Sequence, residues 1–315
     1  MEDQAGPGPS LLVRLERIVE SPVVRFLAVA VLLVLVVRAA DSEAMRDAAA
    51  TARWILVLPA LLLVPVQYLG AALLWRGLAR TIDPKLSLAE AFRAVMGGLS
   101  VSIWTPGRAG EFAARPTLMP RGSRKAFAVA VGTESLLRLP VPLLLGIPAA
   151  FVVGFTGHVA FAGVLCITAG ATVLLLLSPG LSDWLARKLR IHNHTAFFAS
   201  LSPARRWALM AGHGGRYLIL TAQFSLIALA MSGTAEVPHM AIASAAVIVF
   251  AAKLLAPVLS FAELGIREGA SIVAFGAVGF SVEAALQASL LLYGVNVLLP
   301  AGFGAMIWLR RAQAS

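Results

Sequence analysis

The sequence predicts an all-α protein whose helices cross a membrane several times. Of its 315 residues, 59% are hydrophobic and only 13% are charged, whereas soluble domains carry roughly 25% charged residues. Apolar runs recur along the chain at the length of about 20 residues that a helix needs to cross the hydrocarbon core. No polar stretch is long enough to form a separate soluble domain. We therefore predict a cytoplasmic N-terminal segment, residues 1–22, followed by a single transmembrane domain, residues 23–315.

Six segments are predicted to span the membrane. The first is short and carries Arg25 and Arg38 near its ends, where long side chains can snorkel to the interface. The second has Trp54 and Trp75 at its ends, as in an aromatic belt. The remaining four follow from apolar runs of sufficient length. In chain order the six spans are Val23–Ala40, Trp54–Trp75, Ala126–Gly154, His158–Ser178, Trp207–Met231 and Glu283–Leu309.

Two further segments, Leu88–Met119 and His239–Phe280, are apolar at first and then become rich in charge and glycine. Each could be one spanning helix plus a loop, or a hairpin that enters and leaves on the same side. Basic loops flank the first segment on both sides, and the positive-inside rule places both in the cytoplasm only if the segment is re-entrant. We therefore predict six full spans and two re-entrant helical hairpins, with both termini cytoplasmic. An eight-span count fits the hydropathy equally well and the charge less well.

A weak internal repeat supports this topology. The stretch "RAGEFAAR" matches "GIREGASI", and "SLLRLPVPLLLGIPA" matches "LLYGVNVLLPAGFGA". The offset is 157 residues for the glutamates (268 − 111) and 158 for the prolines (300 − 142). The predicted hairpins enter from opposite sides, so the two halves, about 54–154 and 207–311, form an inverted repeat of the kind that transporters use to alternate access.

The first charged motif, "WTPGRAGEFAARP", suits a phosphate. Pro106 is well placed to begin a short helix, whose free N–H groups and positive dipole end attract anions. Arg108 and Arg115 supply guanidinium groups, and Glu111 can pair with either of them at a spacing of three or four residues. A solvated turn between two helices is the plainer interpretation of the same stretch.

The second charged motif repeats this chemistry in the other half. Glu263 and Arg267 are four residues apart, and Glu268 follows directly before Gly269. Lys253 lies upstream in an otherwise apolar helix. The plainer interpretations are an exposed loop for the motif and a snorkelling side chain for Lys253.

Further polar residues lie inside the predicted spans. Glu134 and Arg138 are four apart, deep in the third span, and Pro140 and Pro142 predict a kink directly after them. Asn296 lies in the last span. The stretch "GHGG" at Gly212–Gly215 fits close helix packing, with a role for His213 in a polar pathway as the alternative.

Charges facing lipid would destabilise this fold severely. Each charge in the middle of a bilayer costs roughly 2.5–3.5 kcal/mol on the insertion scale, so ten of them cost on the order of 25 kcal/mol. That exceeds the usual net stability of about 5–15 kcal/mol. The charges must therefore pair with one another or line a wet cavity, and a purely structural ion-pair network is the alternative. The ten are Arg108, Glu111, Arg115, Glu134, Arg138, Arg216, Lys253, Glu263, Arg267 and Glu268.

At "TPGRAGEFAAR" and "LGIREGA" the sequence resembles the lysylphosphatidylglycerol synthase transmembrane-region family, also called flippase-like domain proteins. The family motifs fall on Pro106, Gly110, Glu111 and Arg115, and then on Gly265, Arg267, Glu268 and Gly269. The resemblance implies a bacterial inner-membrane protein. Two-domain members carry a soluble aminoacyl-transferase domain after this region and flip the modified lipid. Because this chain ends after its last span, it is expected not to aminoacylate lipids. Ala114 and "ESLLRL" depart from the family pattern, which leaves the substrate open.

The expected function is translocation of an anionic or polyprenyl-phosphate-linked lipid through a central polar cavity. The substrate-binding residues are expected to be Arg108, Glu111, Arg115, Glu134, Arg138, Lys253, Glu263, Arg267, Glu268 and Asn296. The alternatives are a small-anion secondary transporter and a non-catalytic partner of a glycosyltransferase or lipid-modifying enzyme. A homo-oligomer is compatible with the sequence.

Several other classes are not expected. The basic residues, which give a formal net charge of +10, are scattered over short loops, which argues against nucleic acid. No nucleophile is paired with a base, so an enzyme is not expected. No cofactor or metal is expected either, because His192 and His194 lack further ligands at a recognisable spacing.

Overall fold

The structure is a computed structural model that describes residues 42–105, 109–178, 197–198, 200–233, 236–255 and 263–313. Every regular element in this part of the chain is a helix, which confirms the all-α prediction. The predicted N-terminal segment, the first predicted span Val23–Ala40 and the two histidines at 192 and 194 lie outside the described residues.

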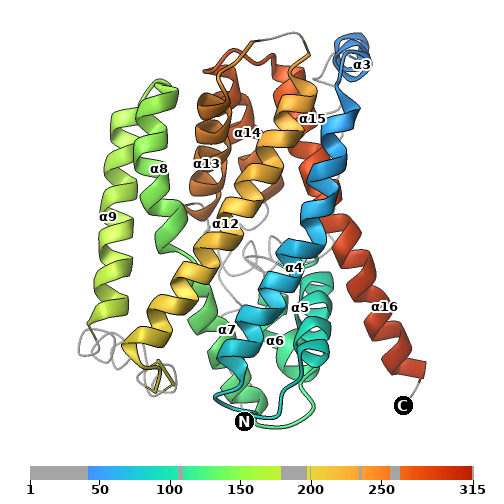
Figure 1. Ribbon diagram of the computed structural model, residues 1–315, viewed down its shortest axis with the longest axis vertical. Helices are drawn as coiled ribbons and strands as arrows, with labels where there is room; N and C mark the ends of the chain where they lie inside the picture. Colours follow the sequence, from blue (N-terminus) through green and yellow to red (C-terminus); the bar gives the residue numbers. More distant parts are fainter. Residues whose placement is uncertain are drawn as a thin grey trace, which may run out of the picture.

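Four helical stretches are long and apolar enough to cross a membrane: Trp54–Ala79, Arg124–Val153, Pro203–Met231 and Val282–Arg311. They match four of the predicted spans. The first contains the 3-10 turn η1 (Trp54–Leu56) and α4 (Val57–Ala79), and the third is α12 (Pro203–Met231). The helices α4 and α12 pack side by side along the molecule (Figure 1). Two other apolar helices are α9 (His158–Leu177) and α13 (His239–Leu255), and α9 coincides with another predicted span.

The other two long stretches are interrupted near their middles. Helix α7 (Arg124–Leu137) stops and α8 (Pro140–Val153) begins after a two-residue break. Pro140 has no N–H to donate, so it fits the first turn of a new helix, and the predicted kink is confirmed. In the last stretch, α15 (Val282–Tyr293) is followed by the π-helical turn η3 (Gly294–Leu298) and α16 (Leu299–Gln313). No signal in the sequence analysis predicted this second interruption.

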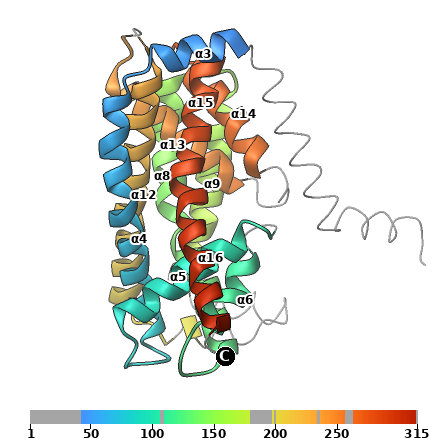
Figure 2. The ribbon, with the colours of Figure 1, turned by 90° about the vertical axis from the view of Figure 1, so that its right-hand side faces the viewer.

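Each of the two charged segments folds into a pair of shorter helices. The first gives α5 (Leu88–Ser102) and α6 (Ala109–Thr117), and the second gives α13 and α14 (Glu263–Gly276). Within each pair the helices pack against each other. The α5–α6 pair lies at one end of the molecule, level with α7 and α16, and the α13–α14 pair lies at the other end (Figure 1, Figure 2). A short helix, α3 (Ser42–Ala50), lies across that second end (Figure 2).

Local sequence explains where the helices begin. Ser87 and Glu90 form a capping box at the start of α5, in which the Ser87 hydroxyl accepts from the Glu90 N–H and the Glu90 carboxylate accepts from the Ser87 N–H at 2.8 Å. Three other helices also begin after a serine cap: Ser123 before α7, Ser202 before α12 and Ser281 before α15. Each serine satisfies an N–H that would otherwise lack a partner.

Two large apolar cores, and a smaller one around Leu143 and Leu165, pack the described helices together. The core at the α13–α14 end centres on Phe224 of α12, whose ring lies 5.1 Å from that of Phe275 on α14 and 5.6 Å from that of Phe250 on α13. The core at the α5–α6 end contains Trp75 and Phe127, both fully buried, with ring centroids 6.3 Å apart. The charged residues described next lie within this packed interior.

Candidate functional site

The first buried cluster of charges joins α6 to α7. It consists of Glu111, Arg115 and Glu134, whose side chains are each 7% exposed or less. Arg115 Nη2 lies 2.9 Å from Glu111 Oε2, which confirms the predicted pairing four residues apart. Arg115 Nη1 donates a hydrogen bond of 2.5 Å to Glu134 Oε2. One guanidinium therefore pairs with two carboxylates, and these three groups together carry a formal charge of −1.

Neighbouring helices enclose Arg115 of this cluster. The guanidinium carbon lies 5.3 Å from the ring centroid of Trp75 on α4, within range of a cation–π interaction. A Cβ atom at Gly98 of α5 would lie 2.5 Å from Arg115 Cγ, so only glycine leaves room for the arginine side chain at this position. The helix α12 supplies His213, which is buried and lies within Coulombic range of Glu134.

The second buried cluster joins α14 to α15 and consists of Arg267, Glu268, Ser289 and Tyr293. Arg267 forms an ion pair with Glu268, and its Nε also donates to Ser289 Oγ at 3.0 Å. The Ser289 hydroxyl donates to Glu268 Oε1 at 3.1 Å, and the Arg267 guanidinium carbon lies 4.7 Å from the Tyr293 ring centroid. The second carboxylate oxygen, Glu268 Oε2, is buried without a hydrogen-bond partner among the described residues.

Polar residues of α4, α12 and η3 lie between the two clusters. We call them the polar file, and they are Gln67, Tyr68, Arg216, Gln223 and Asn296. On α12 they are Arg216 and Gln223, seven residues apart and therefore on one face of the helix. Arg216 Nε donates to the Gln67 carbonyl at 3.2 Å, and the Asn296 amide donates to the Gln223 side chain. The backbone carbonyl of Asn296, in the π-helical turn, accepts a hydrogen bond from the Tyr68 hydroxyl.

The polar file meets a cluster at each of its ends. On α12, His213 precedes Arg216 by one turn and lies within Coulombic range of Glu134 of the first cluster. In the last stretch, Tyr293 of the second cluster precedes Asn296 by one turn. The interruption at η3 is therefore where the second cluster and the polar file meet.

The remaining predicted site residues occupy less central positions. Arg138 caps the C-terminal end of α7, is half-buried and lies within Coulombic range of Glu134. The carboxylate of Glu134 forms its ion pair with Arg115, which approaches from across the α6–α7 contact. Lys253 is half-buried in the last turn of α13. Arg108 and the side chain of Glu263 lie outside the described part of the chain.

Sequence reasoning missed several members of the site. Ser289 and Tyr293 lie in an apolar stretch of α15, and Gln223 lies in a similar stretch of α12, so nothing in their neighbourhoods distinguished them. The "GHGG" stretch packs closely against neighbouring helices, as predicted, and the role of His213 in a polar pathway stays a prediction. A Cβ at Gly214 would lie 3.2 Å from Val141 Cγ2, which fits close helix packing, while His213 lies within Coulombic range of Glu134 in the first cluster.

These observations define a polytopic α-helical membrane protein in which ion-paired charges are buried between helices of both halves. The chain matches the family described as "Lysylphosphatidylglycerol synthase TM region" over residues 23–304, and it belongs to this family. Membership connects the chain to membrane lipids. A comparison with curated proteins found no match.

Proposed function

We propose that this chain is a lipid translocator of the bacterial inner membrane, not an enzyme, and that it moves a lipid with a phosphate-containing head group. The observation that carries the proposal is the burial of two arginines, Arg115 and Arg267, one in each half of the chain, at 5% exposure each. Guanidinium groups bind phosphate oxygens in a planar, two-pronged geometry. A membrane interior tolerates such groups only with partners, and they commonly mark a substrate pathway.

The topology that supports transport is two inverted repeats, with α5–α6 and α13–α14 as re-entrant hairpins. The offset of 157–158 residues relates α4 to α12, α5 to α13, α6 to α14, α7 to α15 and α8 to α16. Under this relation, the packing of α5 on α16 corresponds to the packing of α13 on α8. The two hairpins lie at opposite ends of the molecule (Figure 1). Reciprocal packing between the halves, with the hairpins at opposite ends, supports an inverted repeat. With six spans, counting Val23–Ala40, both termini are cytoplasmic.

The sum of the charges in the first cluster suggests how a phosphate would bind there. Glu111, Arg115 and Glu134 together carry a charge of −1, and both terminal nitrogens of the guanidinium are engaged by carboxylates until one carboxylate moves away or takes up a proton. Protonation of either carboxylate would make the cluster neutral and leave part of the guanidinium fork available to the phosphate. We infer that entry of the head group is coupled to protonation of Glu111 or Glu134.

The polar file offers the head group a route between the two clusters. Arg216, Gln223 and Asn296 carry hydrogen-bond donors along α12 and η3, which contact the Gln67 carbonyl, the Ala60 carbonyl and the Gln223 side-chain oxygen. At the far end, Glu268 Oε2 has no hydrogen-bond partner among the described residues. The lipid tail would stay in the bilayer while the head group moves along these donors. Rocking of the hairpins against α4 and α12 would open the route to one side at a time.

The proposal is tested by transport in reconstituted vesicles. Phosphate lipids with a fluorescent head group would be followed as they reach the outer leaflet. We expect Arg115→Met and Arg267→Met each to reduce the rate at least ten-fold, whereas Arg124→Gln, at an exposed position, serves as the charge-matched control. An unchanged rate in both methionine variants, at normal protein yield, would refute the mechanism. Equally tight binding of a head-group analogue without a tail would favour a small-anion transporter instead.

A further inference from the structure

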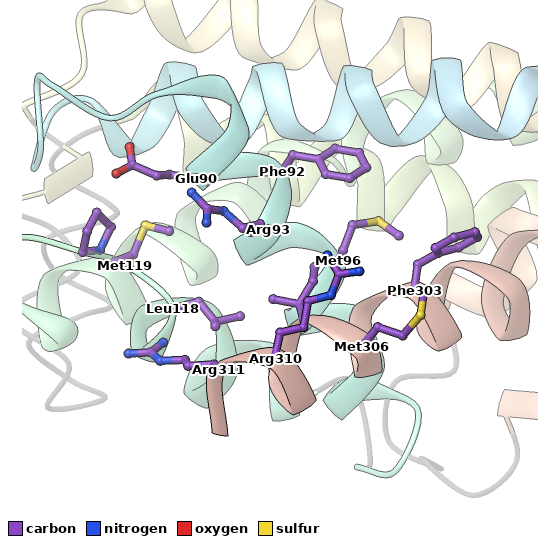
Figure 3. A pocket seen from close by; sticks show the side chains of 12 residues that line it. Glu90, Phe92, Arg93, Met96, Leu118, Met119, Phe303, Met306, Arg310 and Arg311 are labelled. Carbon is purple, nitrogen blue, oxygen red and sulfur yellow. The ribbon is translucent and has the colours of Figure 1, made fainter. Parts of the chain in front are cut away.

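A groove with a volume of about 810 Å³ lies between α5, the end of α6 and the last turns of α16. Figure 3 shows the side chains that line it. None of the residues predicted for the site belongs to its lining, and neither buried cluster contributes to it. The groove is therefore a separate feature, formed where the first hairpin meets the final helix of the other half.

The lining divides into a charged part and an apolar part. Arg93 of α5 and Arg310 and Arg311 of α16 supply three positive charges, against one carboxylate from Glu90 (a formal sum of +2). The apolar part includes Met96, Phe303 and Met306 (Figure 3). Phe303 and Met306 are 54% and 46% exposed, so apolar surface is available to a partner.

The single carboxylate of the groove is already occupied. Glu90 accepts from the Ser87 N–H and hydroxyl in the capping box, at 2.8 and 2.7 Å. Arg121, which is not part of the lining, also lies 3.4 Å from Glu90. The oxygens of Glu90 are therefore engaged by Ser87 and Arg121, and the lining keeps its formal sum of +2.

The three arginines of the groove make different contacts. Arg311 Nη1 donates to the Thr117 carbonyl at 2.8 Å and so ties α16 to the end of α6. Arg93 Nε donates a long hydrogen bond of 3.4 Å to the Ala89 carbonyl of its own helix, and the guanidinium lies within Coulombic range of Glu90. Arg93 and Arg310 are both exposed, so their guanidinium groups are the ones available to a ligand.

We propose that this groove binds an anionic phospholipid. Its phosphate would lie between the guanidinium groups of Arg93 and Arg310, and an acyl chain would lie against Met96, Phe303 and Met306. The position suits such a ligand, because the last candidate span ends at Arg311, where a helix leaves the membrane and phosphates are found. The charge excess selects an anion, and the adjoining apolar surface selects one with a tail. This inference does not depend on the proposed transport activity.

The test measures lipid binding to the purified full chain in mild detergent by native mass spectrometry. The probes are dioleoyl phosphatidic acid, the neutral lipid dioleoylglycerol, and glycerol 3-phosphate, which has no tail. Wild-type protein is expected to bind phosphatidic acid at least ten-fold more tightly than either of the others. The double variant Arg93→Gln/Arg310→Gln should weaken that binding about thirty-fold, since each basic residue near a membrane surface contributes about a factor of five.

Matched controls separate the groove from general surface effects. Arg124→Gln/Lys125→Gln removes two positive charges at exposed positions outside the lining and should leave binding within two-fold. Phe303→Gln should weaken binding about ten-fold, whereas Leu309→Gln, on the same helix and 64% exposed, should not.

Three results would overturn the proposal. The first is phosphatidic acid binding that is unchanged in the double glutamine variant. The second is glycerol 3-phosphate binding as tightly as the lipid, which would make the apolar wall irrelevant. The third is a change of oligomeric mass in the double variant with unchanged lipid binding, which would assign the groove to a second copy of the chain.

Discussion

The first cluster allows a direct test of whether its charges serve stability or function. Replacing Arg115 with methionine removes the guanidinium that pairs with both Glu111 and Glu134, and leaves two buried carboxylates without that partner. Replacing Glu134 with glutamine leaves the Glu111–Arg115 pair intact and neutral. Replacing all three by apolar residues (Glu111→Leu, Arg115→Met and Glu134→Leu) removes the charges altogether.

The three variants should differ in free energy of unfolding in a fixed order. Arg115→Met should cost about 3–5 kcal/mol, because breaking a buried pair leaves uncompensated charge. Glu134→Gln should cost about 1–3 kcal/mol, the range for one charged hydrogen bond. The triple variant should lie within about 2 kcal/mol of wild type, since apolar replacement of a buried ionic group is often neutral or stabilising.

The measurement is equilibrium unfolding in mixed micelles with increasing denaturing detergent, together with transport in vesicles. We expect the triple variant to unfold near the wild-type midpoint and yet fail to transport. If Arg115→Met unfolds at the same midpoint as Glu134→Gln, the electrostatic reasoning is refuted. If the triple variant transports at the wild-type rate, the cluster is structural and carries no phosphate.

Other consequences of the structure can be measured separately. Gly304→Ala would place a Cβ against the Met96 carbonyl oxygen, so it should displace α16 and lower the melting temperature in detergent, whereas nothing lies within 4 Å at Gly302 and Gly302→Ala should have little effect. Asn296→Ala should cost about 1–3 kcal/mol in denaturing-detergent titration, because it leaves the buried Gln223 oxygen without its donor. At the start of α5, hydrogen bonds from Ser87 hold the pKa of Glu90 below its usual value of 4.5. A depressed carboxyl pKa contributes stability above the unfolded value and loses it as the pH falls through the folded value. Ser87→Ala should therefore raise the pKa of Glu90 in carboxyl NMR and reduce the loss of stability below about pH 4.5.

Much of the helical framework could be predicted from local sequence. Apolar length identified the stretches that contain α4, α9 and α12, and Pro140 identified the break between α7 and α8. The break at η3 was missed although Pro300, two residues after the turn, has no N–H to donate to the backbone carbonyl of Asn296. The Tyr68 hydroxyl of α4 donates to that carbonyl, a contact that depends on tertiary packing.

The candidate site was predictable only in part. Local spacing predicted the pair of Glu111 and Arg115, because residues four apart share a helix face. The pair of Arg115 and Glu134 depends on how α6 packs against α7, and the approach of Arg115 also depends on a glycine in α5. The groove at the end of α16 was not predicted, since its lining comes from segments about two hundred residues apart in the chain.

The sequence by itself determined that this is a helical membrane protein and that its interior charges need partners, because both conclusions follow from apolar length and from the cost of placing a charge in lipid. Only the tertiary structure decided which partners they have. Two arginines from the two halves became the centres of separate buried clusters, with Gln223 and Asn296 between them. Such pairings depend on where helices cross, and crossing positions arise from side-chain packing across the whole chain.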